Sequence, residues 1–163
     1  MGEVPAFVGT GLLLLLWRYR YALLFALAGL LVTPLSYLLK DKIGTDRPIT
    51  YFEKENIREL VVVVPDVDLN GGQTSFPSGH TMAAFALYGV VALTAGRLLP
   101  WLGLACAWTA ILVGVSRIFL VQHFLLDVLG GAAIGLLLAV LLWRLDQRYA
   151  GRFPALNAGL LSR

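Results

Sequence analysis

Residues able to do chemistry gather in three short polar segments of an otherwise apolar chain. These segments are Lys40-Asp41-Lys42-Ile43-Gly44-Thr45-Asp46-Arg47-Pro48, then Pro77-Ser78-Gly79-His80, and then Ser116-Arg117 with His123 and Asp127. Both histidines of the chain lie in them. Transfer of a phosphoryl group needs an attacking group and a proton for the leaving oxygen, and histidine can supply either. The pattern therefore indicates phosphoryl-transfer chemistry.

Three cations from distant parts of the chain point to a polyanion as the bound group. Lys40, Arg47 and Arg117 would repel one another in one pocket, so their gathering requires a compensating anion. A phosphate fits, because the guanidinium fork matches two of its oxygens. Ser78-Gly79 stands where a loop is expected to become a helix, and free backbone N–H groups there favour an anion. The sequence thus predicts a phosphate pocket.

The two histidines are given different roles by their neighbours. His123 and Asp127 are four residues apart, so on a helix they would share a face. A carboxylate that accepts one ring N–H fixes the tautomer and leaves the other nitrogen free to attack. This predicts His123 as the nucleophile, Asp127 as its orienting group and His80 as the general acid.

Each of these residues also has a simpler explanation when taken alone. Lys40 and Arg117 could be interfacial anchors at helix ends, and His80 could be a hydrogen-bonded core or cap residue. Asp127 could complement a helix dipole, and Ser78 could be a plain N-cap. Because all of these explanations would have to hold together on one side of a membrane, the shared phosphate site is the preferred interpretation.

The composition indicates a membrane protein. Of the 163 residues, 58% are hydrophobic and only 14% are charged, whereas soluble domains are about 45–50% apolar and about 25% charged. The net charge of +3 is scattered, so no nucleic-acid partner is expected. The single cysteine, Cys106, cannot form an intrachain disulfide and is interpreted as a buried small hydrophobe.

Apolar segments of helical length position the three polar groups. The long ones are residues 21–39, 81–95, 101–115 and 124–143, and residues 4–17 form a shorter one. A spanning helix needs roughly 17–25 residues. We therefore expect an all-α integral membrane bundle of four clear transmembrane helices plus a short N-terminal fifth, in one domain over residues 1–163. Whether residues 4–17 span or lie in the interface stays open. They are not interpreted as a signal peptide, since a signal peptide has its positive charges before the apolar run, whereas Arg18 and Arg20 follow it.

The long polar break at residues 41–79 is expected to lie outside the membrane and to carry part of the site. It holds most of the charged side chains of the first two thirds of the chain. Within it, the β-branched run at residues 60–64 could be a strand, a patch that dips into the interface, or a packed core segment. The active site is thereby predicted at the membrane–water edge.

The distribution of cations predicts the orientation. The loop side holds Lys40, Lys42, Arg47, Lys54, Arg58 and Arg117, and the other side holds Arg18, Arg20, Arg97, Arg144, Arg148, Arg152 and Arg163. Removing the three pocket cations leaves a clear excess on the second side, which the positive-inside rule places in the cytoplasm. We expect a multi-pass protein of the inner (cytoplasmic) membrane whose active site faces the periplasm or the outside.

The three polar segments resemble the signature of the type 2 phosphatidic acid phosphatase (PAP2) family. That signature is K-x6-R-P, P-S-G-H and S-R-x5-H-x3-D, and this chain matches all three parts in order. The resemblance implies phosphate binding by Lys40, Arg47 and Arg117, helped by Ser78 and Gly79. The motif prolines Pro48 and Pro77 and the motif serine Ser116 would support the site, Ser116 by hydrogen bonding rather than by reacting.

The resemblance also implies the reaction. His123 would form a phosphohistidine, Asp127 would support it, His80 would protonate the leaving group, and water would release phosphate, with no cofactor and no metal. The substrate would be a membrane lipid phosphate held in the bilayer, such as undecaprenyl diphosphate, phosphatidylglycerol phosphate, phosphatidic acid or lipid A. Residues that select among them would lie in the loop at 49–76 and on the lipid-facing walls. Typical bacterial members have six spans, so this chain departs in lacking an N-terminal one.

Other functions are compatible with parts of this pattern. A lipid-to-lipid phosphotransferase would use the same residues and differ only in its acceptor. A vanadate-dependent haloperoxidase would have the same anion pocket, but those proteins are large and soluble. A non-catalytic scaffold would be expected to lose motif residues, and every motif position here is intact. The oligomeric state is not predicted.

Overall fold

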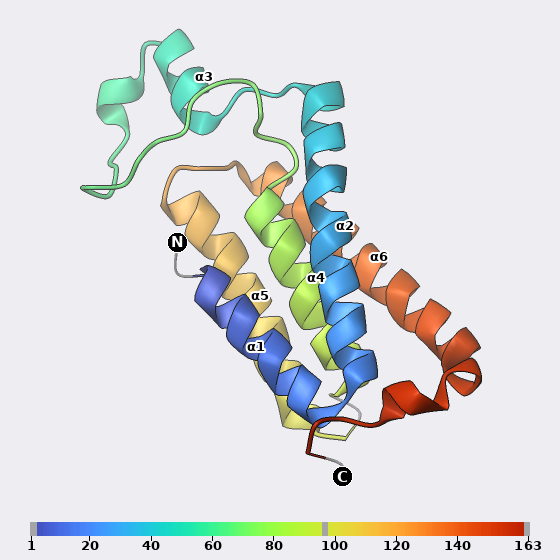
Figure 1. The fold of residues 1–163 in the computed structure, drawn as a ribbon. Coiled ribbons are helices and arrows are strands. Elements are labelled where there is room, and N and C mark those ends of the chain that lie inside the picture. Colours follow the sequence, from blue (N-terminus) through green and yellow to red (C-terminus); the bar gives the residue numbers. More distant parts are fainter. Residues whose placement is uncertain (1–2, 96–97, 162–163) are drawn as a thin grey trace.

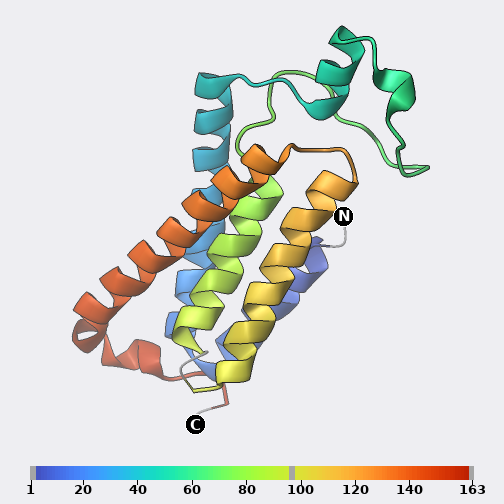
Figure 2. The same ribbon diagram turned by 180° about the vertical axis from the view of Figure 1, so that it is seen from behind.

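The computed structural model describes residues 3–95 and 98–161, and in this part of the chain the regular structure is helical. Five long helices lie side by side as a bundle, and a short helix stands at one end of it (Figures 1 and 2). The long helices are α1 (Glu3–Trp17), α2 (Tyr19–Ile43), α4 (Gly79–Thr94), α5 (Pro100–Phe119) and α6 (Leu125–Tyr149). The short one is α3 (Pro48–Lys54). The predicted all-α bundle is confirmed.

Helices α2, α5 and α6 are long and apolar enough to cross a membrane. Helix α4 has 16 residues and α1 has 15, which is slightly less than the roughly 17 residues that a span requires. Helix α4 occupies the centre of the bundle, where it packs against α2, α5 and α6. The neighbouring helices therefore enclose this short helix, as the complete burial of Met82 and Val90 shows.

Helix α2 continues past the point at which the apolar run ends. It extends through Ile43, so Lys40 lies in its last turn. Gly44 then adopts the left-handed conformation with φ of 56°, and its N–H donates to the carbonyl of Lys40 over 3.1 Å. Glycine takes this conformation without steric cost and commonly ends helices. The end of α2 thus places Lys40 in the last helical turn, where the apolar run gives way to the polar segment.

Glycines let α6 approach α4 closely. A Cβ atom on Gly131 would lie 2.6 Å from the carbonyl oxygen of Ser78, and one on Gly135 would lie 3.0 Å from the backbone nitrogen of Ala86. A Cβ on Gly89 of α4 would lie 2.9 Å from that of Ala139. Small residues spaced by four on one helix face permit this packing within a membrane. The contact holds the start of α6 against the start of α4.

The segment between α2 and α4 lies beyond the helix ends and carries α3 and a short 3-10 turn, Arg58–Leu60 (Figure 1). Residues 61–64 have no regular secondary structure. Leu60 is 82% exposed and Val62 is 91% exposed. Of the three interpretations of residues 60–64, the strand and the packed core segment are therefore wrong, and the interfacial patch stays a prediction.

At the opposite end of the bundle, the segment after α6 returns to the junction of α1 and α2 (Figure 1). The N–H of Tyr19 donates to the carbonyl of Ala158 over 2.8 Å, and the N–H of Leu161 donates to the carbonyl of Leu16 over 3.1 Å. The last carbonyls of a helix lack partners within the helix. In this returning segment, Leu161 supplies a donor to one of these carbonyls at the end of α1, and Ala158 supplies an acceptor to the first N–H of α2.

Candidate active site

Four helix ends meet at the loop end of the bundle and bring the sequence-predicted residues together (Figure 1). Lys40 lies in the last turn of α2, and His80 lies in the first turn of α4. Arg117 lies in the last turn of α5, and Asp127 lies in the first turn of α6. Because helices adjacent in sequence run in opposite directions, residues from distant parts of the chain reach one place.

A cavity of about 250 Å³ opens among these helix ends. All three predicted cations and both histidines line it, namely Lys40, Arg47, Arg117, His80 and His123. The remaining walls come from Val67, Asp68 and Asn70 of the long loop and from Leu120 and Gln122. The cavity is therefore cationic on balance, with three cations against one carboxylate, and has two imidazoles in its wall.

His123 and Asp127 form a buried pair at the base of the cavity. The Nδ1 atom of His123 lies 3.6 Å from Oδ2 of Asp127, and each residue is 4% exposed. The expectation that they share a helix face is wrong, because α6 begins only at Leu125 with Phe124 as its N-cap, so His123 precedes the helix. The same carboxylate oxygen accepts the backbone N–H of Phe124 over 2.8 Å. Asp127 thus caps α6 and holds the histidine.

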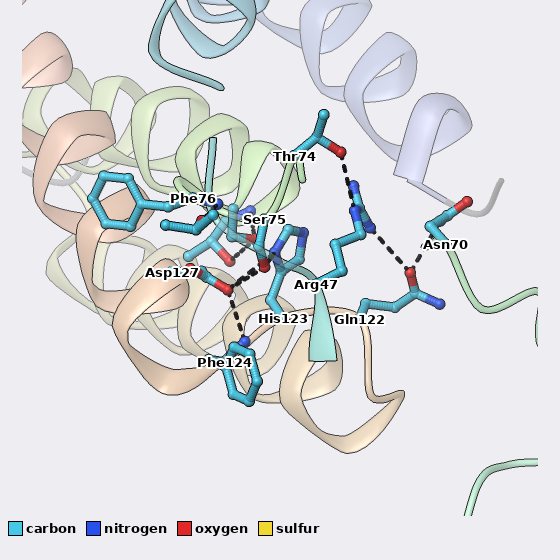
Figure 3. Close-up of polar contacts among 12 residues, drawn as sticks. Arg47, Asn70, Thr74, Ser75, Phe76, Gln122, His123, Phe124 and Asp127 are labelled. Carbon is cyan, nitrogen blue, oxygen red and sulfur yellow. Dashed lines mark hydrogen bonds and ion pairs between the residues drawn. The ribbon is translucent and has the colours of Figure 1, made fainter. Parts of the chain in front are cut away.

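Ser75 completes this pair and was missed by the sequence reasoning (Figure 3). Its hydroxyl donates to Oδ2 of Asp127 over 2.5 Å and lies 3.4 Å from Nδ1 of His123. The side chain is fully buried. Its one sequence signal was its position two residues before Pro77, and no residue-type rule distinguishes it from an ordinary loop serine.

The environment of His123 favours the neutral imidazole. Burial lowers the pKa of His123 below its ordinary value of 6.5, and the positive charges of Arg47 and Lys40 lower it further. The hydrogen bond to Asp127 acts in the opposite direction. A neutral imidazole keeps a lone pair on one ring nitrogen, and the contact of Nδ1 with Asp127 leaves Nε2 as the candidate attacking atom.

The turn at Pro77-Ser78-Gly79 positions the start of α4 against α2 and α6. Ser78 caps α4, with its Oγ 2.9 Å from Oγ1 of Thr81, and its backbone N–H donates to the carbonyl of Asp127 over 2.9 Å. A Cβ on Gly79 would lie 3.1 Å from Oγ of Ser36, so glycine allows α4 to approach α2 beside Lys40. The N-cap explanation of Ser78 therefore holds, whereas its contact with phosphate stays a prediction, because the side chain is fully buried and the backbone N–H is already bonded.

The supporting residues lie at the edges of the site. Pro48 is the first residue of α3, and Pro77 follows Phe76 through a cis peptide bond. The hydroxyl of Ser116 donates to the carbonyl of Val113 over 2.7 Å and accepts from Nε of Arg117 over 3.2 Å. Ser116 thus holds the guanidinium that faces the cavity.

A larger cavity of about 560 Å³ shares Lys40, Arg47 and His80 with the first. It extends along α2 and α4 as far as Val32 and Ala83. Val32 precedes Lys40 by eight residues, which is roughly 12 Å along a helix. The cavity therefore joins a charged end to an uncharged groove. No group of three His, Cys, Asp or Glu side chains arranged to hold a metal ion occurs among residues 3–95 and 98–161.

Comparison with known proteins agrees with this geometry. The family model of the PAP2 superfamily matches residues 7–150. Phosphatidylglycerophosphatase B of Bacillus subtilis is 39% identical over an alignment of 114 positions, which covers 64% of this chain and 55% of that protein. Lipid A 1-phosphatase of Porphyromonas gingivalis is 43% identical over 67 residues, which are 41% of this chain and 15% of that protein. The chain thus spans about half or less of the length of these two curated relatives.

A solved structure shows the same fold. The crystal structure of a transmembrane PAP2-type phosphatidylglycerolphosphate phosphatase from Bacillus subtilis is 31% identical and superposes with a TM-score of 0.68. The match covers 90% of this chain and 69% of that one. The family match, the shared fold and the intact three-part signature lead to one conclusion: this chain belongs to the PAP2 superfamily.

Proposed function

We propose that this chain is a membrane lipid phosphatase that hydrolyses a phosphate monoester or diphosphate through a phosphohistidine on His123. The observation that carries the proposal is the pair of cavities that share Lys40, Arg47 and His80 in their walls. One holds three cations and two histidines, and the other leads from Lys40 along α2 to an uncharged groove. A lipid phosphate divides in a matching way, with an anionic head for the cations and an uncharged tail for the groove.

The proposed first step transfers the phosphoryl group to the protein. Nε2 of His123 attacks phosphorus, the N–P bond forms, and the bond from phosphorus to the lipid oxygen breaks. His80 gives its proton to the departing oxygen. Lys40, Arg47 and Arg117 stabilise the charge on the phosphoryl oxygens in the transition state. Asp127 accepts a hydrogen bond from the Nδ1–H group, which keeps its proton, and stabilises the positive charge that develops on the ring.

The proposed second step returns the protein to its starting state. His80, now neutral, accepts a proton from water as the water oxygen attacks phosphorus. The N–P bond breaks, and inorganic phosphate leaves with His123 again neutral. No metal or cofactor takes part in the proposed sequence.

The names of the relatives support a lipid substrate. They describe a phosphatidylglycerophosphatase, a lipid A 1-phosphatase and a probable diacylglycerol pyrophosphate phosphatase. For this chain we propose the same class, with undecaprenyl diphosphate and phosphatidic acid as further members. The cation distribution supports a site that faces the outside of the cytoplasmic membrane.

The test is a phosphate-release assay in detergent with a panel of these lipid phosphates, in the presence of EDTA. Wild-type protein is expected to release inorganic phosphate from at least one lipid, and His123→Ala is expected to be inactive. Phosphate appearing on a second lipid instead of in solution would favour the phosphotransferase. Loss of activity with EDTA would exclude the metal-free reaction, and full activity of His123→Ala would exclude His123 as the nucleophile.

A further inference from the structure

Gln122, the residue before His123, makes three hydrogen bonds to the long loop at residues 41–79. Figure 3 shows the two that its oxygen accepts, from Arg47 and Asn70. Its Nε2 donates to the carbonyl of Asp68 over 2.7 Å. Its Oε1 accepts from Nδ2 of Asn70 over 3.0 Å and from Nη1 of Arg47 over 3.4 Å. The residue is buried, with 6% of its surface exposed.

These partners fix the amide orientation. The carbonyl of Asp68 can only accept, whereas Asn70 Nδ2 and the Arg47 guanidinium can only donate. If the amide were flipped, its nitrogen would face the donors of Asn70 and Arg47, and its oxygen would face the carbonyl oxygen of Asp68. Gln122 is thus held in one orientation with its carbonyl directed at Arg47.

Arg47 is held at two points by neutral oxygens. Its Nε donates to Oγ1 of Thr74 over 3.3 Å, and its Nη1 donates to Gln122. Neutral acceptors orient a guanidinium without neutralising its charge, whereas a carboxylate would compete with a bound anion. Planar recognition of phosphate by arginine depends on this orientation.

We propose that Gln122 is a positioning residue that presents the Arg47 guanidinium to the phosphate. This role rests on the proposed function, because it assumes that the cavity binds a phosphoryl group. Gln122 acts through Arg47 and does not itself contact the reacting atoms.

The experiment measures binding of orthovanadate, a phosphate analogue, to the purified full chain by calorimetry. Gln122→Ala is expected to raise the dissociation constant about fivefold, which corresponds to the roughly 1 kcal/mol of one hydrogen bond. In an Arg47→Met background the same substitution is expected to change it less than twofold, because coupled residues are not additive. Thermal unfolding verifies that each variant is folded.

Asp46→Ala is the matched control. It breaks the exposed ion pair of Asp46 with Lys54, a contact of 2.6 Å beside Arg47, without touching Gln122. It is expected to leave the dissociation constant within twofold. An equal loss in this control would show that any loosening of the loop weakens binding, and it would overturn the inference.

The outcomes separate the inference from the proposed function. Vanadate binding with the expected non-additivity, but no release of phosphate from any lipid, would overturn the function and support the role of Gln122. Lipid hydrolysis with an unchanged dissociation constant in Gln122→Ala, or with additive effects of the two substitutions, would overturn the inference alone. No vanadate binding by the wild type would overturn both.

Discussion

The contact between α4 and α6 at Gly131 makes a prediction whose size follows from the geometry. In Gly131→Ala the new Cβ would lie 2.6 Å from the carbonyl oxygen of Ser78 and 3.3 Å from the backbone nitrogen of Met82. Ordinary contacts begin at about 3.4 Å. The helices must therefore separate by about 0.8 Å locally, because the obstructing atoms are backbone and cannot rotate away.

Two costs and one gain decide the expected change in the free energy of unfolding. Overpacking of this kind costs about 1–3 kcal/mol, and loss of the hydrogen bond from the Ser78 N–H to Asp127 would cost about 1 kcal/mol more. Replacing glycine by alanine within a helix returns about 1 kcal/mol. We expect a net loss of about 1–3 kcal/mol in the free energy of unfolding, measured by thermal or denaturant unfolding in detergent. Activity should fall as well, since Ser78 and Asp127 would be displaced.

Gly9→Ala is the control, because it makes the same chemical change inside α1 where a Cβ would meet nothing within 4 Å. It should be neutral or stabilising by up to about 1 kcal/mol. If Gly131→Ala were as stable as Gly9→Ala and fully active, the close approach of the two helices would be refuted.

Three further predictions concern Ser75, His123 and Val121. Ser75→Ala should lower kcat about tenfold or more, because the hydroxyl that orients buried Asp127 is worth about 1.5–3 kcal/mol, while vanadate binding stays within twofold; an unchanged kcat would contradict this. The lowered pKa of His123 means that the attacking neutral imidazole persists below pH 6.5, so the acidic limb of the kcat/KM profile, on which this imidazole becomes protonated, should have its midpoint below that value, and an acidic midpoint above it would be evidence against His123 as nucleophile. Val121 has φ of 56°, which costs a β-branched residue about 1–2 kcal/mol, so Val121→Gly should unfold at a higher temperature than Val121→Ala, and the reverse order would contradict the strain.

The bundle and the main site residues were predictable because the bilayer and the phosphate each impose strict requirements. Apolar segments of spanning length had to become helices, since backbone groups in lipid need internal partners. Lys40 and Arg117 were recognisable because they gather with Arg47 and both histidines on one side of the membrane, where separate anchoring roles would all have to coincide. The structure places both on the cavity wall.

The residues that were missed hold the site through contacts that a linear pattern does not contain. Ser75 and Gln122 are neutral polar residues in loops, where such residues are common and normally meet water. They matter here because the loop folds back over the helix ends and buries them. The pairing of His123 with Asp127 was anticipated for the wrong reason, because the N-cap at Phe124 places the histidine outside the helix.

The segment that returns from α6 to α1 bears on the order in which this protein assembles. Leu161 and Leu16, whose backbones bond over 3.1 Å, are separated by 145 residues in the sequence. On the ribosome α1 is therefore synthesised long before its capping donors exist. Closing so long a loop carries an entropic cost that only a formed bundle offsets. Docking of α1 should thus be a late step of biogenesis, and its final position should report that the other helices have already packed.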